Sequence, residues 1–241
     1  MSSAHSTSQS TSPDTTESGP TASGARPRRS SARDLAQIAV FAALIAALGL
    51  PGALTIGGTA VPITFQTLGV MLAGAILGAR KGTLSVLLFI ALVAAGLPLL
   101  SGGRGGLGVF VGPSVGYLIG WLLGAAVIGW ATARLLPRYP VVPALAWTAL
   151  GGIVAIYLVG VPVFAAITGT PLGLAISGSA VFLPGDLLKV VVTVFVAKGV
   201  HRAWPGLIEP RSWPWAPRPG AVVADPASDS ASDSTAADRS A

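Results

Sequence analysis

The stretch LGLAISGSAVFLPGDLLKVVVTVFVAKGV, residues 172–200, is mostly apolar but carries an acid and a base near its middle. Asp186 is the only acidic residue between Asp34 and Glu209, and Lys189 follows it three positions later. A charge in a hydrocarbon-compatible stretch is energetically costly unless another group compensates it. The pair is therefore a candidate functional site.

The same stretch is too long for one simple membrane span. Its 29 residues would form a helix of about 43 Å, whereas a hydrocarbon core is about 30 Å thick. Proline fits the first turn of a helix, because its missing N–H group is not needed there. We expect the last span to begin at Pro184, with 169–183 as an extracytoplasmic connection that folds back on the protein.

The whole chain has the composition of an integral membrane protein. Hydrophobic residues make up 52% of its 241 positions and charged residues only 10%, well away from the averages of soluble domains. The sequence predicts an all-α integral membrane protein with six transmembrane helices. The predicted spans are 34–50, 62–79, 82–100, 114–136, 143–168 and 184–202.

The distribution of basic residues predicts the orientation. An even number of spans places both termini on one side, and short cytoplasmic loops are enriched in Lys and Arg. We expect both termini to be cytoplasmic in a multi-pass protein of the plasma membrane, with Arg104 as the one basic residue outside. These loops explain the net charge of +6 without nucleic acid. The basic residues on the predicted cytoplasmic side are Arg26, Arg28, Arg29, Arg33, Arg80, Lys81, Arg134, Arg138, Lys198 and Arg202.

Two tails flank the predicted membrane domain. Residues 1–33 contain no Val, Ile, Leu or aromatic residue and are rich in Ser and Thr, which predicts a disordered cytoplasmic tail. Residues 34–202 form the six-helix domain. In 203–241, tryptophans alternate with Pro and Arg before an acidic end, which predicts an interfacial and then disordered cytoplasmic tail, although a plain linker explains the pattern equally well.

Several kinds of site are excluded. The chain has no Cys, and His5 and His201 lie in different regions, so we expect no metal site, no cofactor and no catalytic residues. Residues 103–108 fit the G-x-G-x-x-G pattern but follow a predicted membrane span, and no acidic residue lies about 20 positions on to hold a ribose. No P-loop motif is present, so any ATP hydrolysis must come from another subunit.

The glycines around Arg104 favour a tight, ligand-facing loop. Glycine accepts positive φ angles and lets backbone N–H groups approach a ligand, as at Gly103 and Gly105. The planar fork of arginine suits a carboxylate or a carbonyl-rich group. A flexible hairpin with a solvated arginine is the alternative.

Asp186 and Lys189 fall near the same outer surface as Arg104. Asp186 would lie in the first turn of the last helix, where the helix dipole favours a negative charge, with Lys189 one turn deeper. A self-neutralising pair that fixes the helix position is the alternative, but three converging charges favour a small-molecule pocket. Aromatic side chains that could enclose the rest of the molecule are Phe110, Tyr117 and Phe182.

Two ladders of small residues predict close helix packing. Such ladders allow helices to approach closely, either within one chain or against a partner, and the pattern alone leaves both open. The ladders are Ala39, Ala43 and Ala47 on the first helix and Gly112, Gly116, Gly120 and Gly124 leading into the fourth.

Four stretches of sequence follow one another along the chain. They are VPITFQTLGVMLAG at 61–74, GGRGGLG at 102–108, GPSVGY at 112–117 and FLPGDLLK at 182–189. Together these motifs resemble the BioY family, the biotin-binding S components of energy-coupling-factor transporters. The resemblance covers about residues 34 to 202.

The resemblance implies a six-helix, lipid-embedded protein that captures biotin and joins a transmembrane coupling subunit and two ATPase subunits. It would place the partner surface on the alanine ladder and the pocket on Arg104, Asp186 and Lys189. A carboxylate accepts the two N–H groups of a ureido ring, and a cation meets its carbonyl. Further substrate-binding candidates are Gly103, Gly105, Tyr117 and Gln66.

The chain departs from the family pattern at a few positions. Ser114 stands where Thr is more usual, Val115 replaces a glycine, and the chain contains no Asn, so a side-chain amide role must pass to Gln66, a hydroxyl or the backbone. An alternative is an ion-coupled secondary transporter of a small carboxylate or vitamin that uses Asp186 and Lys189. An intramembrane enzyme is less well supported, because the spans lack a second carboxylate.

Overall fold

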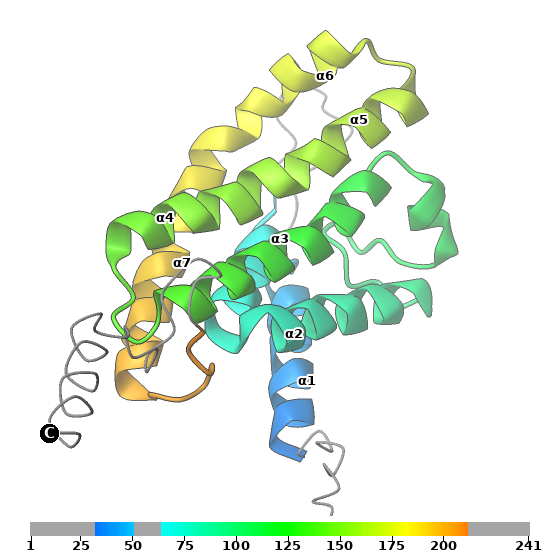
Figure 1. Ribbon diagram of the computed structural model, residues 1–241. Helices are drawn as coiled ribbons and strands as arrows, with labels where there is room; N and C mark the ends of the chain where they lie inside the picture. Colours follow the sequence, from blue (N-terminus) through cyan, green and yellow to red (C-terminus); the bar gives the residue numbers. More distant parts are fainter. Residues whose placement is uncertain (1–31, 51–63, 212–241) are drawn as a thin grey trace, which may run out of the picture. The chain divides into compact units, whose positions relative to one another are not determined.

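The computed structural model describes residues 32–50 and 64–211 (Figure 1), and within them the regular elements are all helical. Some of the predictions concern residues outside these ranges. They are the N-terminal tail with His5, most of the C-terminal tail, and the start of the first motif at 61–63. The η2 segment is a π-helix, and η1 and η3 are 3-10 turns. The elements are α1 (Ala32–Ala47), α2 (Gln66–Ala94), η1 (Leu107–Val111), α3 (Val115–Leu135), α4 (Val141–Ala149), η2 (Leu150–Ala155), α5 (Ile156–Thr168), α6 (Leu172–Ser179), η3 (Ala180–Phe182) and α7 (Leu183–Ala203).

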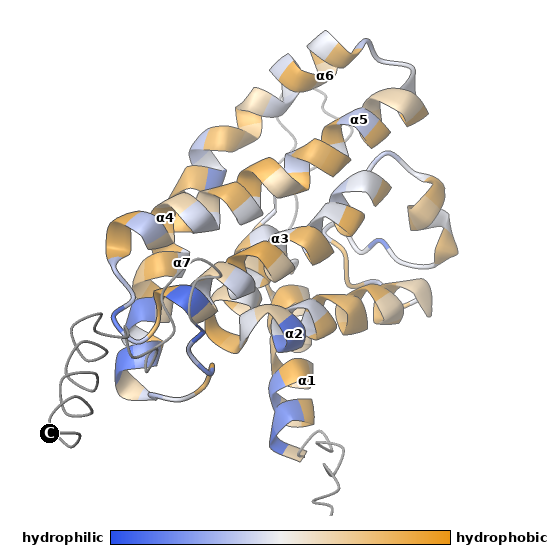
Figure 2. Ribbon diagram, in the orientation of Figure 1, coloured by the Kyte–Doolittle hydropathy of each residue, from blue (hydrophilic) through white to orange (hydrophobic). Residues whose placement is uncertain are grey.

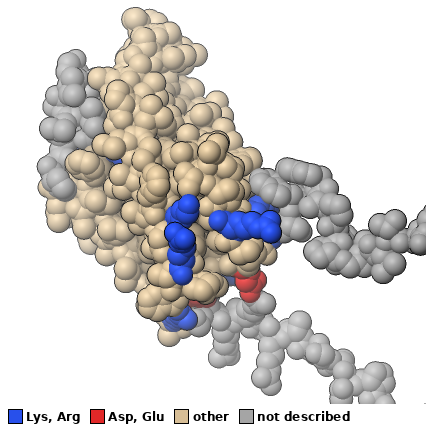
Figure 3. Space-filling view, turned by 90° about the vertical axis from the view of Figure 1, so that its left-hand side faces the viewer, with Lys and Arg blue, Asp and Glu red and all other residues tan. Residues whose placement is uncertain are grey.

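Four helical runs in the described part of the chain are long and apolar enough to cross a bilayer. They are 66–94, 115–135, 141–168 and 172–203. Apolar residues cover most of these helices, and hydrophilic residues gather where α1 begins and α7 ends (Figure 2). Figure 3 shows one face on which Lys and Arg gather in the lower part below a broad surface without charge. The chain is an all-α, multi-pass membrane protein.

The α2 helix bends sharply at Gly78, where the backbone is not helical (φ 82°, ψ 176°). A Cβ atom added to Gly82 would lie 2.6 Å from the carbonyl oxygen of Ala73, so the two arms of α2 fold back on each other. The predicted break between the second and third spans, at Arg80 and Lys81, thus lies two residues earlier, at Gly78, and contains no loop. Glycine accepts the positive φ angle, and the helix resumes without a loop.

The second arm of α2 ends at Ala94, earlier than the predicted end at residue 100. Gly96 follows with φ 104°, and Pro98 cannot continue the helix. Residues 95–106 instead form a loop, pinned where the Gly106 N–H donates to the carbonyl of Val93 at 2.8 Å. This shorter helix places Arg104 in the loop rather than directly beyond a helix end.

The predicted connection at 169–183 is mostly helical, which corrects the expected break. Pro184 does stand in the first turn of α7, as predicted. However, the chain before it forms α6 and the 3-10 turn η3, so 172–203 is one continuous helical run, and α6 packs against α5. The missing N–H group of Pro184 is accommodated by the 3-10 turn η3 that precedes α7, without a loop.

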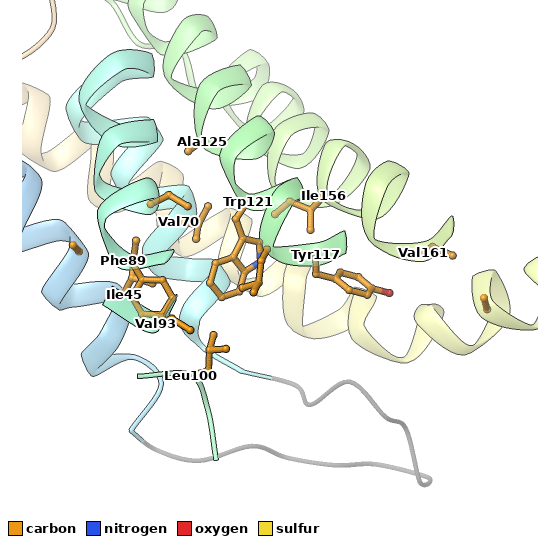
Figure 4. Packing of buried hydrophobic residues seen from close by; sticks show 14 of the residues in the cluster. Ile45, Val70, Phe89, Val93, Leu100, Tyr117, Trp121, Ala125, Ile156 and Val161 are labelled. Carbon is orange, nitrogen blue, oxygen red and sulfur yellow. The ribbon is translucent and has the colours of Figure 1, made fainter. Parts of the chain in front are cut away.

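One cluster of buried apolar residues lies between α1, α2, α3 and α5 (Figure 4), and a second lies between α2, α3, α4 and α7. The rings of Phe89 and Trp121 lie 6.0 Å apart in the first cluster. The glycines of α3 bring α5 close, because a Cβ at Gly120 would lie 2.7 Å from the carbonyl oxygen of Ile156. Gly116 and Gly124 also face α5 or the adjoining π-helix, so these members of the predicted glycine ladder serve packing within the chain.

The alanine ladder of α1 is in the opposite situation. Ala39, Ala43 and Ala47 are all exposed, while Ala42 and Ile45 on the other side of the helix are buried and α1 packs on α2. We call these three alanines the α1 stripe.

The α1 helix is fixed at its start by polar contacts. The Lys81 ammonium donates to Asp34 at 3.3 Å and to Gln37 at 2.7 Å.

Residues 204–211 fold beneath the bend of α2. Ile208 is buried beside Gly78, and the Arg211 N–H donates to the carbonyl of Ala133 at 2.7 Å. The α2 bend, the start of α1 and the ends of α3 and α7 thus share one end of the molecule. We call it the basic end, because Arg80, Lys81, Arg134, Lys198 and Arg202 belong to these segments.

Candidate functional site

A cavity opens away from the basic end and collects most of the predicted pocket residues. The space between its lining atoms is about 680 Å³, a figure that includes solvent at its open mouth. Residues from α2, α3, α5 and α7 line it, together with η2, η3 and the loop that carries Arg104. The lining residues are Thr64, Gln66, Thr67, Leu100, Arg104, Ser114, Tyr117, Leu118, Trp121, Gly152, Ile156, Tyr157, Phe182, Asp186 and Lys189.

Asp186 and Lys189 form a buried ion pair on α7. The Lys189 Nζ lies 2.9 Å from Asp186 Oδ1, and each side chain is only 8% exposed. Asp186 lies in the first turn of α7, as predicted. An ion pair this buried offsets the cost of its desolvation only when its remaining polar atoms are also hydrogen-bonded.

Two residues that the sequence analysis did not identify complete this pair. The Tyr157 hydroxyl donates to Asp186 Oδ2 at 2.6 Å, and Lys189 donates to the Thr67 hydroxyl at 2.9 Å. Both Asp186 oxygens thus accept one bond, and each can accept another. The pair is held in a fixed position between α2, α5 and α7, with bonding capacity left for a ligand.

The π-helix explains why Tyr157 could not be found by helical periodicity. The η2 segment immediately precedes α5. Its wider turn changes the direction in which later side chains point, relative to a regular α-helix. Gly152, Ile156 and Tyr157 consequently all line the cavity. Thr67 did carry a signal, since it belongs to the first motif and directly follows Gln66.

Arg104 lies across the cavity mouth in the glycine-rich loop. Its side chain is half-buried, and its Nε donates to the Ser101 carbonyl at 3.3 Å. Gly103 has φ 70°, and a Cβ on Gly105 would collide with the Leu97 carbonyl. Both glycines are therefore needed for the loop path that presents the guanidinium.

Gly103 and Gly105 do not line the main cavity. They lie in a neighbouring open hollow with Gly108 and Gly112, which shares Arg104 and Ser114 with the cavity. Of the three predicted aromatic residues, Tyr117 and Phe182 line the cavity and Phe110 does not. Tyr117 also shares a hydrogen bond of 3.3 Å with the Ser179 hydroxyl.

Gln66 lines the cavity, but its amide is bonded to the backbone. Its Nε2 donates to the Leu99 carbonyl at 3.0 Å and to the Ile45 carbonyl at 3.4 Å, and its Oε1 accepts from the Ser101 N–H at 3.1 Å. Gln66 is 1% exposed. In this structure it is a positioning residue for the loop that carries Arg104.

The chemistry of the cavity suits a small anion with a polar ring or head. Its charged lining residues are Arg104, Asp186 and Lys189, which leave one net positive charge. Leu118, Trp121 and other apolar side chains form most of the remaining wall. Within the described ranges, no group of three or more His, Cys, Asp or Glu is placed to hold a metal ion.

Comparison with known proteins agrees with this arrangement. The BioY family matches residues 20–206. The chain belongs to the BioY family. "Biotin transporter BioY" of Rhodobacter capsulatus is 49% identical over 73% of this chain and 97% of that protein. The protein of the same name from Rhizobium etli is 44% identical over 73% of this chain and 96% of that protein.

A solved structure also resembles this BioY-family chain. It is described as the S-component for biotin from an ECF-type ABC transporter. It superposes with a TM-score of 0.68 at 35% identity, covering 70% of this chain and 91% of that chain. The match therefore extends over nearly the whole length of the solved protein.

Proposed function

We propose that this chain binds biotin as the substrate-capture subunit of an ATP-driven vitamin importer of the energy-coupling-factor class. The observation that carries the proposal is the buried Asp186–Lys189 pair facing Arg104 across a largely apolar cavity. Membership of the BioY family and the names of the similar proteins support the proposal. The subunit binds its substrate and catalyses no reaction.

The donors and acceptors of the cavity match those of biotin. The two N–H groups of the ureido ring need an acceptor, which Asp186 supplies with its two free lone-pair positions. The ureido carbonyl and the valerate carboxylate each need a cation, and Lys189 and Arg104 are available for these roles. The thioether ring and aliphatic chain fit against Leu118, Trp121 and the other apolar walls.

The proposed membrane arrangement has six spans with both termini in the cytoplasm. The spans are α1, the two arms of α2, α3, α4 with α5, and α6 with α7. Clustering of lysine and arginine at the basic end supports a cytoplasmic location for that end. The cavity then opens to the outside, as capture of an external nutrient requires.

The α1 stripe is the proposed contact with the transmembrane coupling subunit, which in turn carries the two ATPase subunits. Ala39, Ala43 and Ala47 are exposed on the part of α1 that is apolar, from Ile38 to its end, and small side chains let a partner helix approach closely. The absence of a P-loop in this chain is consistent with ATP hydrolysis by other subunits.

Equilibrium binding of labelled biotin to the purified chain, without partners or ATP, tests the proposal. We expect saturable binding that Lys189→Gln weakens by about tenfold or more, since it removes one charged hydrogen bond. Lys198→Gln is the matched control, because Lys198 lies on the same helix but does not line the cavity. Absence of saturable binding would overturn the proposal.

Transport assays separate this proposal from ion-coupled secondary transport. We expect biotin uptake to require the ATPase subunits. Uptake that persists without them and collapses with the proton gradient would instead assign Asp186 to ion coupling.

A further inference from the structure

A second hollow lies on the other side of the π-helix, between α3 and the α4–α5 run. We call it the tryptophan groove, because the rings of Trp130 and Trp147 meet there, 5.4 Å apart in an edge-to-face arrangement. Within residues 32–50 and 64–211, its other lining residues are all Ala, Val or Leu, from Ala126 on α3 to Leu158 on α5. This described lining is therefore almost entirely apolar.

The groove has the length of one membrane leaflet. From Trp147 to Leu158 the helical rise is about 16 Å, close to half of a hydrocarbon core of about 30 Å. Trp147 lies about 9 Å into the helical run that begins at Val141. The groove thus extends from near the basic end toward the centre of the bilayer.

A cationic group stands at the basic end of the groove. Arg134 follows Trp130 by one turn of α3, and its guanidinium carbon lies 3.6 Å from the centre of the Trp130 ring. Its Nη1 donates to the Trp130 carbonyl at 3.1 Å, which holds the guanidinium over the indole. The backbone of Arg211 lies close by, since its N–H donates to the carbonyl of Ala133, the residue before Arg134.

We propose that the tryptophan groove binds an acyl chain of an anionic phospholipid, with the lipid phosphate at Arg134 and Arg211. The guanidinium groups match a phosphate in charge and in hydrogen-bond geometry. A hydrocarbon chain has no polar groups, so it can occupy a groove that offers none, whereas a non-helical peptide segment would leave its backbone unsatisfied. The site is distinct from the substrate cavity and lies on the opposite side of η2.

Native mass spectrometry of the full-length chain in detergent, supplied with phosphatidylglycerol or phosphatidylcholine of identical acyl chains, tests the site. We expect preferential retention of phosphatidylglycerol. Arg134→Gln should reduce that preference by about fivefold, the effect of one cation near a phosphate. Arg80→Gln is the matched control: it removes the same charge from the basic end but lies on α2, outside the groove.

A second variant tests the acyl-chain part of the proposal. Ala126→Phe fills the groove from a half-buried position, so we expect it to reduce retention of both lipids while folding normally. Equal retention of the two lipids by the wild-type chain, or an equal effect of Arg134→Gln and Arg80→Gln, would overturn the headgroup assignment. If Ala126→Phe left lipid retention unchanged and instead blocked assembly with the coupling subunit, the groove would be a protein interface and the proposal would be wrong.

Discussion

Replacing Asp186 with Asn removes one charge from the cavity while keeping the shape of the side chain. In the wild-type chain, Asp186 accepts from Lys189 at 2.9 Å and from the Tyr157 hydroxyl at 2.6 Å. Asparagine can keep its oxygen toward Lys189 and donate its amide to the oxygen of the Tyr157 hydroxyl. The geometry of the cavity is therefore preserved, and the main change is electrostatic.

The expected loss of biotin affinity follows from the hydrogen bonds to the ureido ring. In the Asn variant one ureido N–H meets a neutral acceptor and the other meets an N–H donor, so each bond loses at least about 1–2 kcal/mol and the two together at least about 2–4 kcal/mol. The dissociation constant for biotin should therefore rise by about 30- to 1000-fold, measured by equilibrium binding to the purified chain. The variant should also lose about 3–5 kcal/mol of stability, because Lys189 is left charged and buried without its counterion.

A double variant separates these two effects. Asp186→Asn with Lys189→Met has no uncompensated charge, so its thermal stability in detergent should recover toward that of the wild-type chain. Its biotin binding should remain weak, because neither charged partner is present. If Asp186→Asn bound biotin within about threefold of wild type while its stability fell, the ion pair would be purely structural and the assignment of Asp186 to the ligand would be refuted.

Three further perturbations have defined outcomes. Tyr157→Phe removes the hydroxyl that orients Asp186. We expect biotin affinity to fall by about five- to twentyfold at unchanged secondary structure, because a hydrogen bond to a charged group is lost. Unchanged affinity would exclude this positioning role. Ala43→Leu should leave biotin binding of the isolated chain intact and reduce co-purification of the coupling subunit, whereas normal assembly would exclude the α1 stripe as the contact. Gly120→Val should lower the free energy of unfolding by about 1–3 kcal/mol or more, because its Cβ would overlap the Ile156 carbonyl, and an unchanged melting curve would contradict the packing of α3 on α5.

The sequence predicted the elements whose signals are local. The apolar runs gave α1, α3 and the α4–α5 run to within a few residues, and Pro184 correctly predicted the start of α7. The charges of Asp186, Lys189 and Arg104 predicted the composition of the cavity because charged residues are rare in this chain.

The features that could not be predicted depend on contacts between residues far apart or on irregular helix geometry. The bend of α2 packs Gly82 against Ala73 in the first arm and Gly78 against Ile208, and hydropathy contains no information about such contacts. Tyr157 was missed because a π-helix shifts its facing, which a regular 3.6-residue period cannot represent. Gln66 lines the cavity, but its bonds to the backbone of Leu99 and Ser101 could not be predicted, because these partners lie in a loop far along the chain.

The bend at Gly78 has a consequence for how the chain enters the membrane during synthesis. The two arms of α2, 66–77 and 79–94, are about 18 Å and 24 Å long, and each is shorter than the roughly 20 residues of a stable independent span. Their mutual contact at Gly82 and Ala73 supplies part of the stabilisation that each arm lacks. The arms should therefore leave the translocon together as a helical hairpin, and a ribosome-stalling experiment that releases the first arm alone should find it outside the bilayer.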